Sequence, residues 1–356
     1  MRRQLNYGWK NTEAKVDYVA INGKLTIDDL VTRAKLLYAM RLFRDAVKLA
    51  HHLIRSGLEW KEVERRLTKY MSNAHYGHSA YQKAKLWKNQ PYLRLRNKFL
   101  FSVGKSHEKG NRNIRLTVNH DSTSVKVKIP HADGKHEWIV CKAKFGRRHF
   151  PLLKKLTSLN NVSYGVEISE DLSIHVYVPF QLYKDFFGKK PNNGEHIASF
   201  DLNSDRINMI IVDKNGNILD VRNEHFPEVT SHGFPKNKAR DTRLKAFVKL
   251  LDYAYYHNVE VTLFEDLERI KRRRFTNSVK ANRKISKFAK HELLQYGVTM
   301  ALKRGFKVFL VSPVNTSKIA RKIHSKLGLD VHTASAYILA KKFINTHKRS
   351  QILTKT

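Results

Sequence analysis

The spacing of apolar residues predicts a helical stretch near the start of the chain. From residue 26 to residue 75, apolar side chains recur at helical spacing with charged residues between them. The stripe consists of Leu30, Leu36, Leu37, Met40, Phe43, Ala46, Val47 and Ala50. Thr26 and Asp29 resemble a capping box at the start of this helix. Gly57 ends the helix, and a second one follows.

Strand patterns dominate the next part of the chain. Residues 106–185 contain short alternating segments separated by turns rich in Gly, Asp and Asn. These segments are RNIRLTVNH, SVKVKIP, HEWIVCKAKF, VSYGVEIS and SIHVYVPF. Residues 9–27 are also extended and carry an Asn22-Gly23 turn signal. A small β-barrel or curled sheet is the natural interpretation.

The period changes again after residues 186–195, which resemble a linker because Gly, Pro and Asn-Asn-Gly lie close together. Strands are predicted at 196–203, 206–213, 218–224, 259–266 and 306–313. Helices are predicted at 234–258, 284–305 and 330–347. The order βββ-α-β-α-β-α is that of an RNase H-like domain, so the fold class is α+β and multidomain.

Charge narrows the choice of partner. The 356 residues include 68 Lys and Arg against 31 Asp and Glu, a formal net charge of +37. A chain that repels itself so strongly is expected to carry a polyanion, and nucleic acid is favoured over a membrane surface. No apolar run approaches the roughly 18 residues of a spanning helix, and MRRQLNYGWKN lacks the apolar core of a signal peptide. With Cys141 as the one cysteine, we expect no disulfide and a reducing cytoplasm.

Three acids occupy corresponding places in the last domain. Asp201 ends the apolar run of its first strand, Glu265 ends the fourth strand, and Asp330 opens the final helix. The first and fourth strands of such a sheet are neighbours, so Asp201 and Glu265 should lie side by side. Converging carboxylates repel one another, and divalent cations relieve that repulsion. Oxygen ligands suit Mg²⁺ or Mn²⁺, and two such ions about 4 Å apart can hydrolyse a phosphodiester.

Each acid also has a purely structural interpretation. Asp201 can cap a turn, and Asp330 can be an ordinary helix N-cap. Glu265 has neighbours of the same charge in Asp266 and Glu268, and Glu268 can pair with the bases that follow. The three acids in register with one fold are a more specific signal than any one of them.

The densest basic segment follows Glu265 directly. We expect it to bind nucleic-acid phosphates beside the metal, although a solvated charged loop is the alternative. The predicted nucleic-acid-binding residues are Arg269, Lys271, Arg272, Arg273, Arg274, Lys280, Arg283 and Lys284. Residues 81–105 interleave aromatic side chains with bases, a pattern open equally to stacking on unpaired bases and to a place in the core.

Around the three acids, the chain resembles the RuvC-type nucleases of the TnpB/OrfB transposon-encoded proteins. These are compact RNA-guided relatives of type V CRISPR effectors. The matching segments are FDLNSDRINMIIVDKNGNIL, VTLFEDLERIK, VSPVNTSKIA and GLDVHTASAYILAKK, within about residues 196–346. The resemblance implies that Asp201, Glu265 and Asp330 are the catalytic metal ligands of a magnesium-dependent, RNA-guided DNA endonuclease of a mobile element. Base pairing would then read the target.

The resemblance also implies a domain layout. Residues 1–27 and 106–185 would form a wedge-like β-barrel, 28–105 a helical recognition segment, 186–195 a linker and 196–350 the RuvC domain. Typical members carry two Cys-x-x-Cys pairs before the last acid, whereas this chain has KIARKIHSKLGL there. We therefore expect no zinc.

Two other functions stay open at this point. The first is a nucleic-acid-binding regulator derived from such a nuclease without relevant cleavage, which the missing zinc ribbon suggests. The second is a guide-independent, structure-selective nuclease of the Holliday-junction type. A two-fold junction substrate would require a dimer, whereas we expect a monomer bound to DNA and a structured guide RNA.

Overall fold

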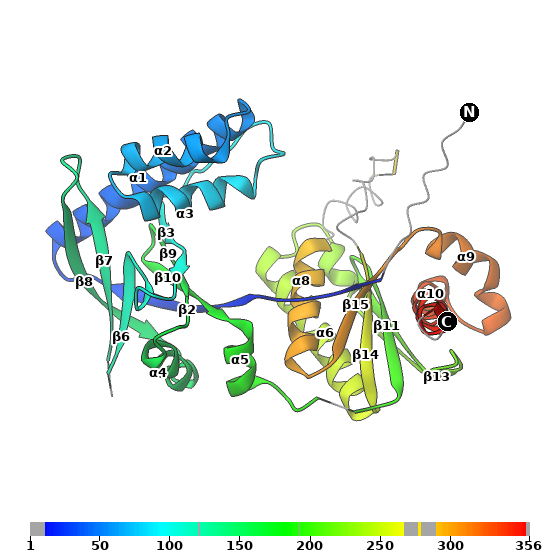
Figure 1. The fold of residues 1–356 in the computed structure, drawn as a ribbon. Coiled ribbons are helices and arrows are strands. Elements are labelled where there is room, and N and C mark those ends of the chain that lie inside the picture. The colour runs from blue at the N-terminus through cyan, green and yellow to red at the C-terminus, as the bar shows by residue number, and fades with distance from the viewer. Residues whose placement is uncertain (1–10, 120–121, 192, 267–276, 279–289, 354–356) are drawn as a thin grey trace. The chain divides into compact units, whose positions relative to one another are not determined.

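The computed structural model describes residues 11–353 except 120–121, 192, 267–276 and 279–289. The chain divides into two compact units (Figure 1). One unit is Asp17–Phe186 and contains the first helices of the chain and the larger sheet. The other combines Met1–Val16 with Phe187–Thr356 and holds the three acids.

Three helices open the Asp17–Phe186 unit, where the sequence predicts a helical segment. They are α1 (Leu30–Arg55), α2 (Trp60–Met71) and α3 (Ala74–Lys85). Asp29 caps α1 by accepting a 2.7 Å hydrogen bond from the Thr32 amide, so the cap is this residue and the predicted box with Thr26 is wrong. Asn73 caps α3 in the same way through the Tyr76 amide.

The sheet of this unit has seven strands in the order β3-β9-β10-β2-β8-β7-β6. They are β2 (Tyr18–Thr26), β3 (Phe99–Ser102), β6 (Ile114–Val118), β7 (Thr123–Pro130), β8 (His136–Phe145), β9 (Gly165–Ser169) and β10 (Ser173–Pro179). Short pieces complete the unit: β4 (Gly104–Lys105), β5 (Gly110–Asn111), α4 (Phe150–Ser158) and most of α5 (Phe180–Phe187). The sheet is open, with edges at β3 and β6, and β3 lies within the range that the sequence gives to the helical segment.

The lone cysteine lies inside this sheet and should be chemically inert in the folded protein. Cys141 is 2% exposed in β8, and burial raises the pKa of its thiol to about 11. Only about a thousandth of the thiol is then ionised at pH 8, and the thiolate is the reactive form. We expect a disulfide reagent such as DTNB to label native protein at least tenfold more slowly than protein in 6 M guanidinium. Equal rates would show that the thiol is accessible.

The second unit contains a six-stranded sheet in the order β1-β15-β14-β11-β12-β13. Its strands are β1 (Thr12–Glu13), β11 (His196–Leu202), β12 (Arg206–Val212), β13 (Ile218–His225), β14 (Val259–Glu265) and β15 (Lys307–Val311). β11, β14 and β15 are parallel, while β12 and β13 run antiparallel to their neighbours. The predicted succession of strands along the chain is confirmed, and so is the adjacency of the first and fourth strands, β11 and β14. Thr12 and Glu13 pair with β15, although the sequence places residues 1–27 with the barrel.

Helices cover both faces of this sheet (Figure 1). They are α6 (Lys236–Tyr256), α8 (Lys290–Lys303) and α10 (Val331–Leu353), and α9 (Thr316–Ile323) packs against α10. α6 and α8 pack on one face through Phe247 and Leu294, and α10 packs on the other through Leu339 and Phe343. No helix in the described part of the chain is long and apolar enough to cross a membrane.

Strand alternation decides which side chains face α10. Phe200 and Phe264 belong to the core under α6 and α8. Successive strand residues point to opposite faces, so Asp201 and Glu265 project toward the α10 side. That face, at the carboxyl ends of β11 and β14, is where the candidate site lies.

Candidate functional site

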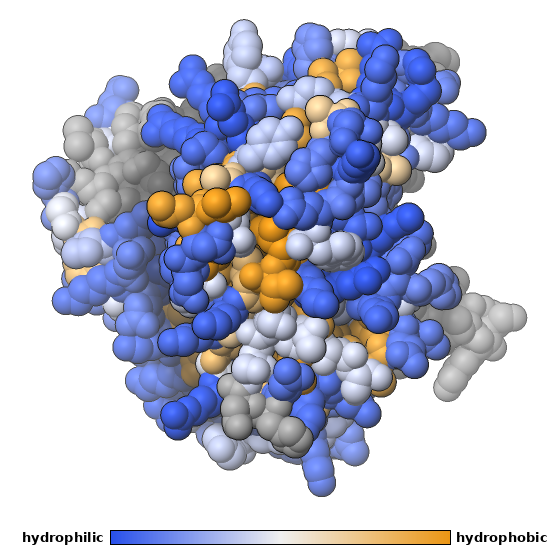
Figure 2. Space-filling view, turned by 90° about the vertical axis from the view of Figure 1, so that its left-hand side faces the viewer, coloured by the Kyte–Doolittle hydropathy of each residue, from blue (hydrophilic) through white to orange (hydrophobic). Residues whose placement is uncertain are grey.

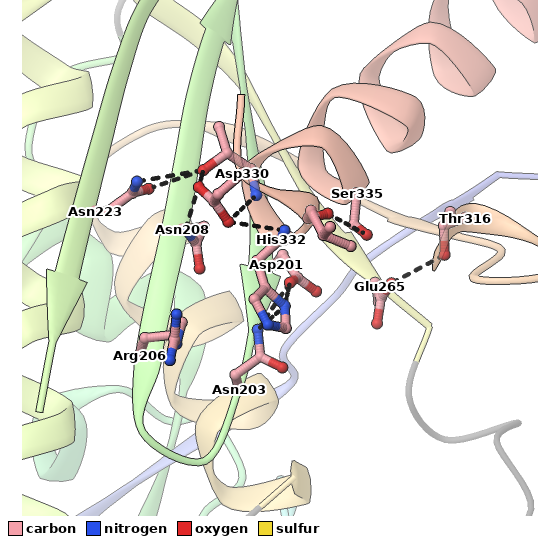
Figure 3. Close-up of polar contacts among 12 residues, drawn as sticks. Asp201, Asn203, Arg206, Asn208, Asn223, Glu265, Thr316, Asp330, His332 and Ser335 are labelled. Atoms are coloured by element: carbon pink, nitrogen blue, oxygen red, sulfur yellow. Dashed lines mark hydrogen bonds and ion pairs between the residues drawn. The ribbon is translucent and has the colours of Figure 1, made fainter. Parts of the chain in front are cut away.

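Two of the three acids stand at the ends of neighbouring parallel strands. Phe200 pairs in register with Phe264, so the next residues, Asp201 and Glu265, end the two strands side by side (Figure 3). Both carboxylates are largely buried, with Asp201 7% and Glu265 8% exposed. Buried carboxylates require hydrogen bonds or a cation, and each of these two has protein partners.

The third acid, Asp330, immediately precedes α10 and is exposed. Its Oδ1 accepts hydrogen bonds from the backbone amides of His332 at 2.8 Å and Thr333 at 3.2 Å, and its Oδ2 accepts one from the Thr333 hydroxyl. Partial burial would raise the pKa of Asp330, but these hydrogen bonds together lower it. The carboxylate thus has the bonds of a helix cap, as the structural interpretation of this residue predicts.

His332 joins the first and third acids, a contact that the sequence analysis missed. Its Nδ1 lies 3.1 Å from Oδ2 of Asp201, and the same oxygen accepts a 2.7 Å hydrogen bond from Nδ2 of Asn203. The hydrogen bond to Asp201 raises the pKa of His332, which favours the imidazolium. The His332 ring therefore lies against Asp201, two residues along the chain from Asp330.

A buried polar network supports Asp330 from the sheet side. The Thr333 hydroxyl accepts hydrogen bonds from Nδ2 of Asn208 at 3.0 Å and Nδ2 of Asn223 at 3.2 Å while it donates to Asp330. Thr333 and Asn208 are fully buried. This network fixes the start of α10 to β12 and β13, and with it the position of the Asp330 carboxylate (Figure 3).

Glu265 has its own neighbours on the side toward α9. The Thr316 hydroxyl, 1% exposed, lies 3.4 Å from Oε1 of Glu265 and also donates to the Pro313 carbonyl at 2.7 Å. Lys342 of α10 lies near enough for Glu265 to act on its pKa: burial lowers that pKa and the carboxylate opposes the effect. Thr316 belongs to the segment Pro-x-x-Thr-Ser that supports the family resemblance, which was the one sequence signal for this contact.

The chemistry of these residues suits a hard divalent cation. Asp201, Glu265 and Asp330 offer oxygen donors, which Mg²⁺ and Mn²⁺ prefer, and Oδ1 of Asn208 is buried beside them without a hydrogen-bond partner among the described residues. Hydrogen bonds to His332, Asn203, Thr333 and Thr316 engage the three acids. Within the described ranges, no three His, Cys, Asp or Glu side chains are already grouped as a metal-binding set.

The predicted basic segment lies outside the described residues. This holds for all eight of its members: Arg269, Lys271, Arg272, Arg273, Arg274, Lys280, Arg283 and Lys284. Their role in nucleic-acid binding stays a prediction from the sequence.

Comparison with solved structures shows the fold. The chain is similar to the protein in a cryo-EM structure of a Cas12f1–sgRNA–target DNA complex, with a TM-score of 0.50 and 12% identity. The match covers 86% of this chain and 81% of that chain. At such low identity, the likeness establishes an architecture in common and nothing finer.

Comparison with other sequences shows the family. A family model described as the SSO2105 N-terminal domain matches residues 18–188. An uncharacterized protein of Aeropyrum pernix is 24% identical over 98% of this chain and 86% of its own length. The uncharacterized protein SSO2105 of Saccharolobus solfataricus is 36% identical over 96% of each chain. The chain therefore belongs to the SSO2105 family.

Proposed function

We propose that this protein is a metal-dependent DNA endonuclease of a mobile genetic element, guided by a structured RNA. The observation that carries the proposal is the pair of buried carboxylates, Asp201 and Glu265, at adjacent strand ends. His332 connects the third acid, Asp330, to Asp201 through hydrogen bonds to both. The likeness to the protein of the Cas12f1–sgRNA–target DNA complex supports the choice of RNA and DNA as partners.

In this proposal the three acids hold Mg²⁺ or Mn²⁺. A bound cation of this kind stabilises negative charge on a phosphodiester and lowers the pKa of a water ligand. The chain's own residues set the geometry: β11 and β14 fix Asp201 and Glu265, and the Thr333 network fixes Asp330. His332 holds Asp201 Oδ2 on the side of α10.

The Asp17–Phe186 unit offers a surface suited to nucleic acid. One face of the β6–β7–β8 part of its sheet is buried, and the other exposes Trp138 and several bases. The Arg115 guanidinium and the Lys128 ammonium each lie 5.0 Å from the Trp138 ring centre. Burial lowers the pKa of Lys128, and the positive charges of Arg112 and Arg115 lower it further. A bound polyanion would relieve the repulsion among these positive charges.

Hydrophilic residues also predominate on the face drawn in Figure 2, and apolar side chains gather near its centre. In a chain with a net charge of +37, the hydrophilic part of this surface suits phosphate-bearing partners. This general feature supports nucleic acid without distinguishing RNA from DNA.

The assignment to the TnpB/OrfB type rests on the motifs rather than on the comparisons. Between Thr316 and Asp330, where typical members place a zinc ribbon, the chain forms α9 and a turn ending at Gly328, and this stretch contains no cysteine. Zinc is therefore not among the proposed cofactors.

One experiment tests the function directly. The protein would be purified with any RNA that accompanies it and mixed with labelled single-stranded DNA in 5 mM Mg²⁺. We expect endonucleolytic cleavage that EDTA abolishes and that RNase pretreatment reduces. Cleavage that survives EDTA would contradict metal dependence, and cleavage that survives RNase would contradict RNA guidance.

The cations around Trp138 give a second prediction. Replacing Arg115 and Lys128 together with alanine should weaken nucleic-acid binding at 100 mM salt and reduce the slope of log K against log salt by about 1.5. The same substitutions at Lys61 and Lys69 on α2 are the matched control. Binding measured by fluorescence anisotropy over 50–300 mM salt would show the slopes, and equal slopes for both double variants would remove this face from the interface.

A specific observation favours the alternative function, a regulator that binds nucleic acid without cleaving it. The imidazole of His332 and the amide of Asn203 already satisfy Oδ2 of Asp201, so protein hydrogen bonds occupy an oxygen that a cation would otherwise bind. Tight binding of the same DNA with no cleavage in either Mg²⁺ or Mn²⁺ would favour this alternative.

A further inference from the structure

We infer that Asn208 is an additional oxygen donor of the cation site, acting through its side-chain Oδ1 on the ion or on a water bound to it. The inference rests on the proposed metal-dependent function and adds a residue that is not among the three predicted metal ligands. The side chain of Asn208 makes one hydrogen bond through Nδ2, and its Oδ1 has no partner among the described residues.

The orientation of the Asn208 amide is fixed by its partner. The Thr333 hydroxyl gives its single hydrogen to Oδ2 of Asp330, so its oxygen can only accept from Asn208. The atom of Asn208 that faces Thr333 at 3.0 Å must therefore be the donor Nδ2. It follows that Oδ1 faces away from Thr333.

That oxygen is buried and has no partner. Asn208 is fully buried, and Oδ1 is among the few buried side-chain atoms in the described residues without a hydrogen bond. A buried amide oxygen left in this state destabilises the fold, because its hydration is lost without replacement. An orphan of this kind in a native structure calls for a ligand, water or ion that satisfies it.

The position of Asn208 identifies the ligand. Asn208 is the register partner of Asp201 on the neighbouring antiparallel strand. Directly opposed residues project to the same face with their Cβ atoms about 4.5–5.5 Å apart. Asn208 thus projects from the same face of the sheet as the buried Asp201 carboxylate, the face that also carries Glu265. Amide oxygens are accepted ligands of hard divalent cations, and they also accept hydrogen bonds from metal-bound water.

The test measures cation binding rather than cleavage. Mn²⁺ alone would be titrated by calorimetry into the full-length protein and its variants, with circular dichroism confirming that each is folded. We expect Asn208→Ala to weaken Mn²⁺ binding about tenfold, as loss of a supporting ligand contact typically does. Asn208→Asp should bind Mn²⁺ at least as tightly as the wild-type protein, because it restores an oxygen donor at the same position.

Asn223→Ala is the matched control. It removes the other amide that donates to the Thr333 hydroxyl but belongs to β13, one strand further from Asp201. We expect this variant to weaken Mn²⁺ binding clearly less than Asn208→Ala does, because it loosens the Thr333 network without removing an oxygen donor beside Asp201. If Asn208→Ala and Asn223→Ala weaken binding equally, both residues act by positioning Asp330, and the donor role of Asn208 is overturned.

Asp201→Asn separates this inference from the proposed function. If Asp201→Asn loses Mn²⁺ binding while Asn208→Ala keeps wild-type affinity, the role of Asn208 is wrong and the metal site stands. If both variants bind Mn²⁺ as the wild-type protein does, the metal site itself is overturned.

Discussion

Replacing Asp201 with alanine is expected to reduce Mg²⁺-dependent DNA cleavage by at least about a thousandfold while leaving the protein folded. Asp201 is one of two buried carboxylates at adjacent strand ends. A cation held there would stabilise the charge of the transition state by several kcal/mol. Loss of about 4 kcal/mol corresponds to a factor of about a thousand in rate. The measurement is single-turnover cleavage of labelled single-stranded DNA with the RNA that accompanies the protein.

Glu195→Gln is the control for this experiment. Glu195 lies just before β11, at the other end of the strand that carries Asp201, and its side chain is 74% exposed. The substitution removes one negative charge from the same unit without touching the candidate site, so cleavage should stay within about twofold of wild type. Unchanged cleavage by Asp201→Ala would rule out this residue as a metal ligand, and a similar loss in both variants would point to a general effect of charge.

The placement of Asp201 and Glu265 could be predicted because it depends on local pattern and on one rule of topology. The apolar runs IASF and VTLF identify two buried strands, and both are followed by an acid. The βββ-α-β order makes those strands neighbours, and the observed pairing of Phe200 with Phe264 confirms it. Strand alternation then sends both acids to the same face.

The partners of these acids could not be predicted, because they come from contacts over long sequence separations. His332 reaches Asp201 across 131 positions, and Asn208 reaches Thr333 across 125. The sequence pattern gives Asn208 no special status, because a polar residue in an apolar strand is as consistent with solvent exposure as with burial. Its significance depends on the packing of α10 over β12, which no local pattern contains.

Strand β1 illustrates a second limit. Residues 9–27 alternate as one extended segment, so the sequence assigns them all to one sheet. The chain instead pairs Thr12 and Glu13 with β15, Tyr18–Lys24 with β10 and Gly23–Thr26 with β8. Extended segments offer hydrogen-bonding groups to any unpaired strand, and the choice between the two sheets is made by the packing of each unit rather than by the segment itself.

Replacing Phe200 with alanine should have the largest effect on stability of any substitution near the site. Its ring is fully buried and lies 5.6 Å from that of Phe247 and 5.0 Å from that of Phe264, measured between ring centres. Removing a buried phenyl group from such a cluster costs about 3–5 kcal/mol of unfolding free energy. For a unit of this size, that lowers Tm by about 6–20 °C. Thermal unfolding followed by circular dichroism would measure the loss.

The same substitution should also impair cleavage, because Phe200 precedes Asp201 and Phe264 precedes Glu265 in register. A cavity under these residues relaxes the two strand ends that hold the acids together, so activity should fall even at temperatures where the variant is folded. Tyr256→Ala, at the end of α6 with 76% of the residue exposed, is the matched aromatic control and should change stability by less than about 1 kcal/mol. If Phe200→Ala unfolds at the temperature of the control, the three rings do not form the core beneath the site. If it is destabilised but cleaves normally when folded, the acids are held by their hydrogen bonds to α10 and α9 rather than by the packing below them.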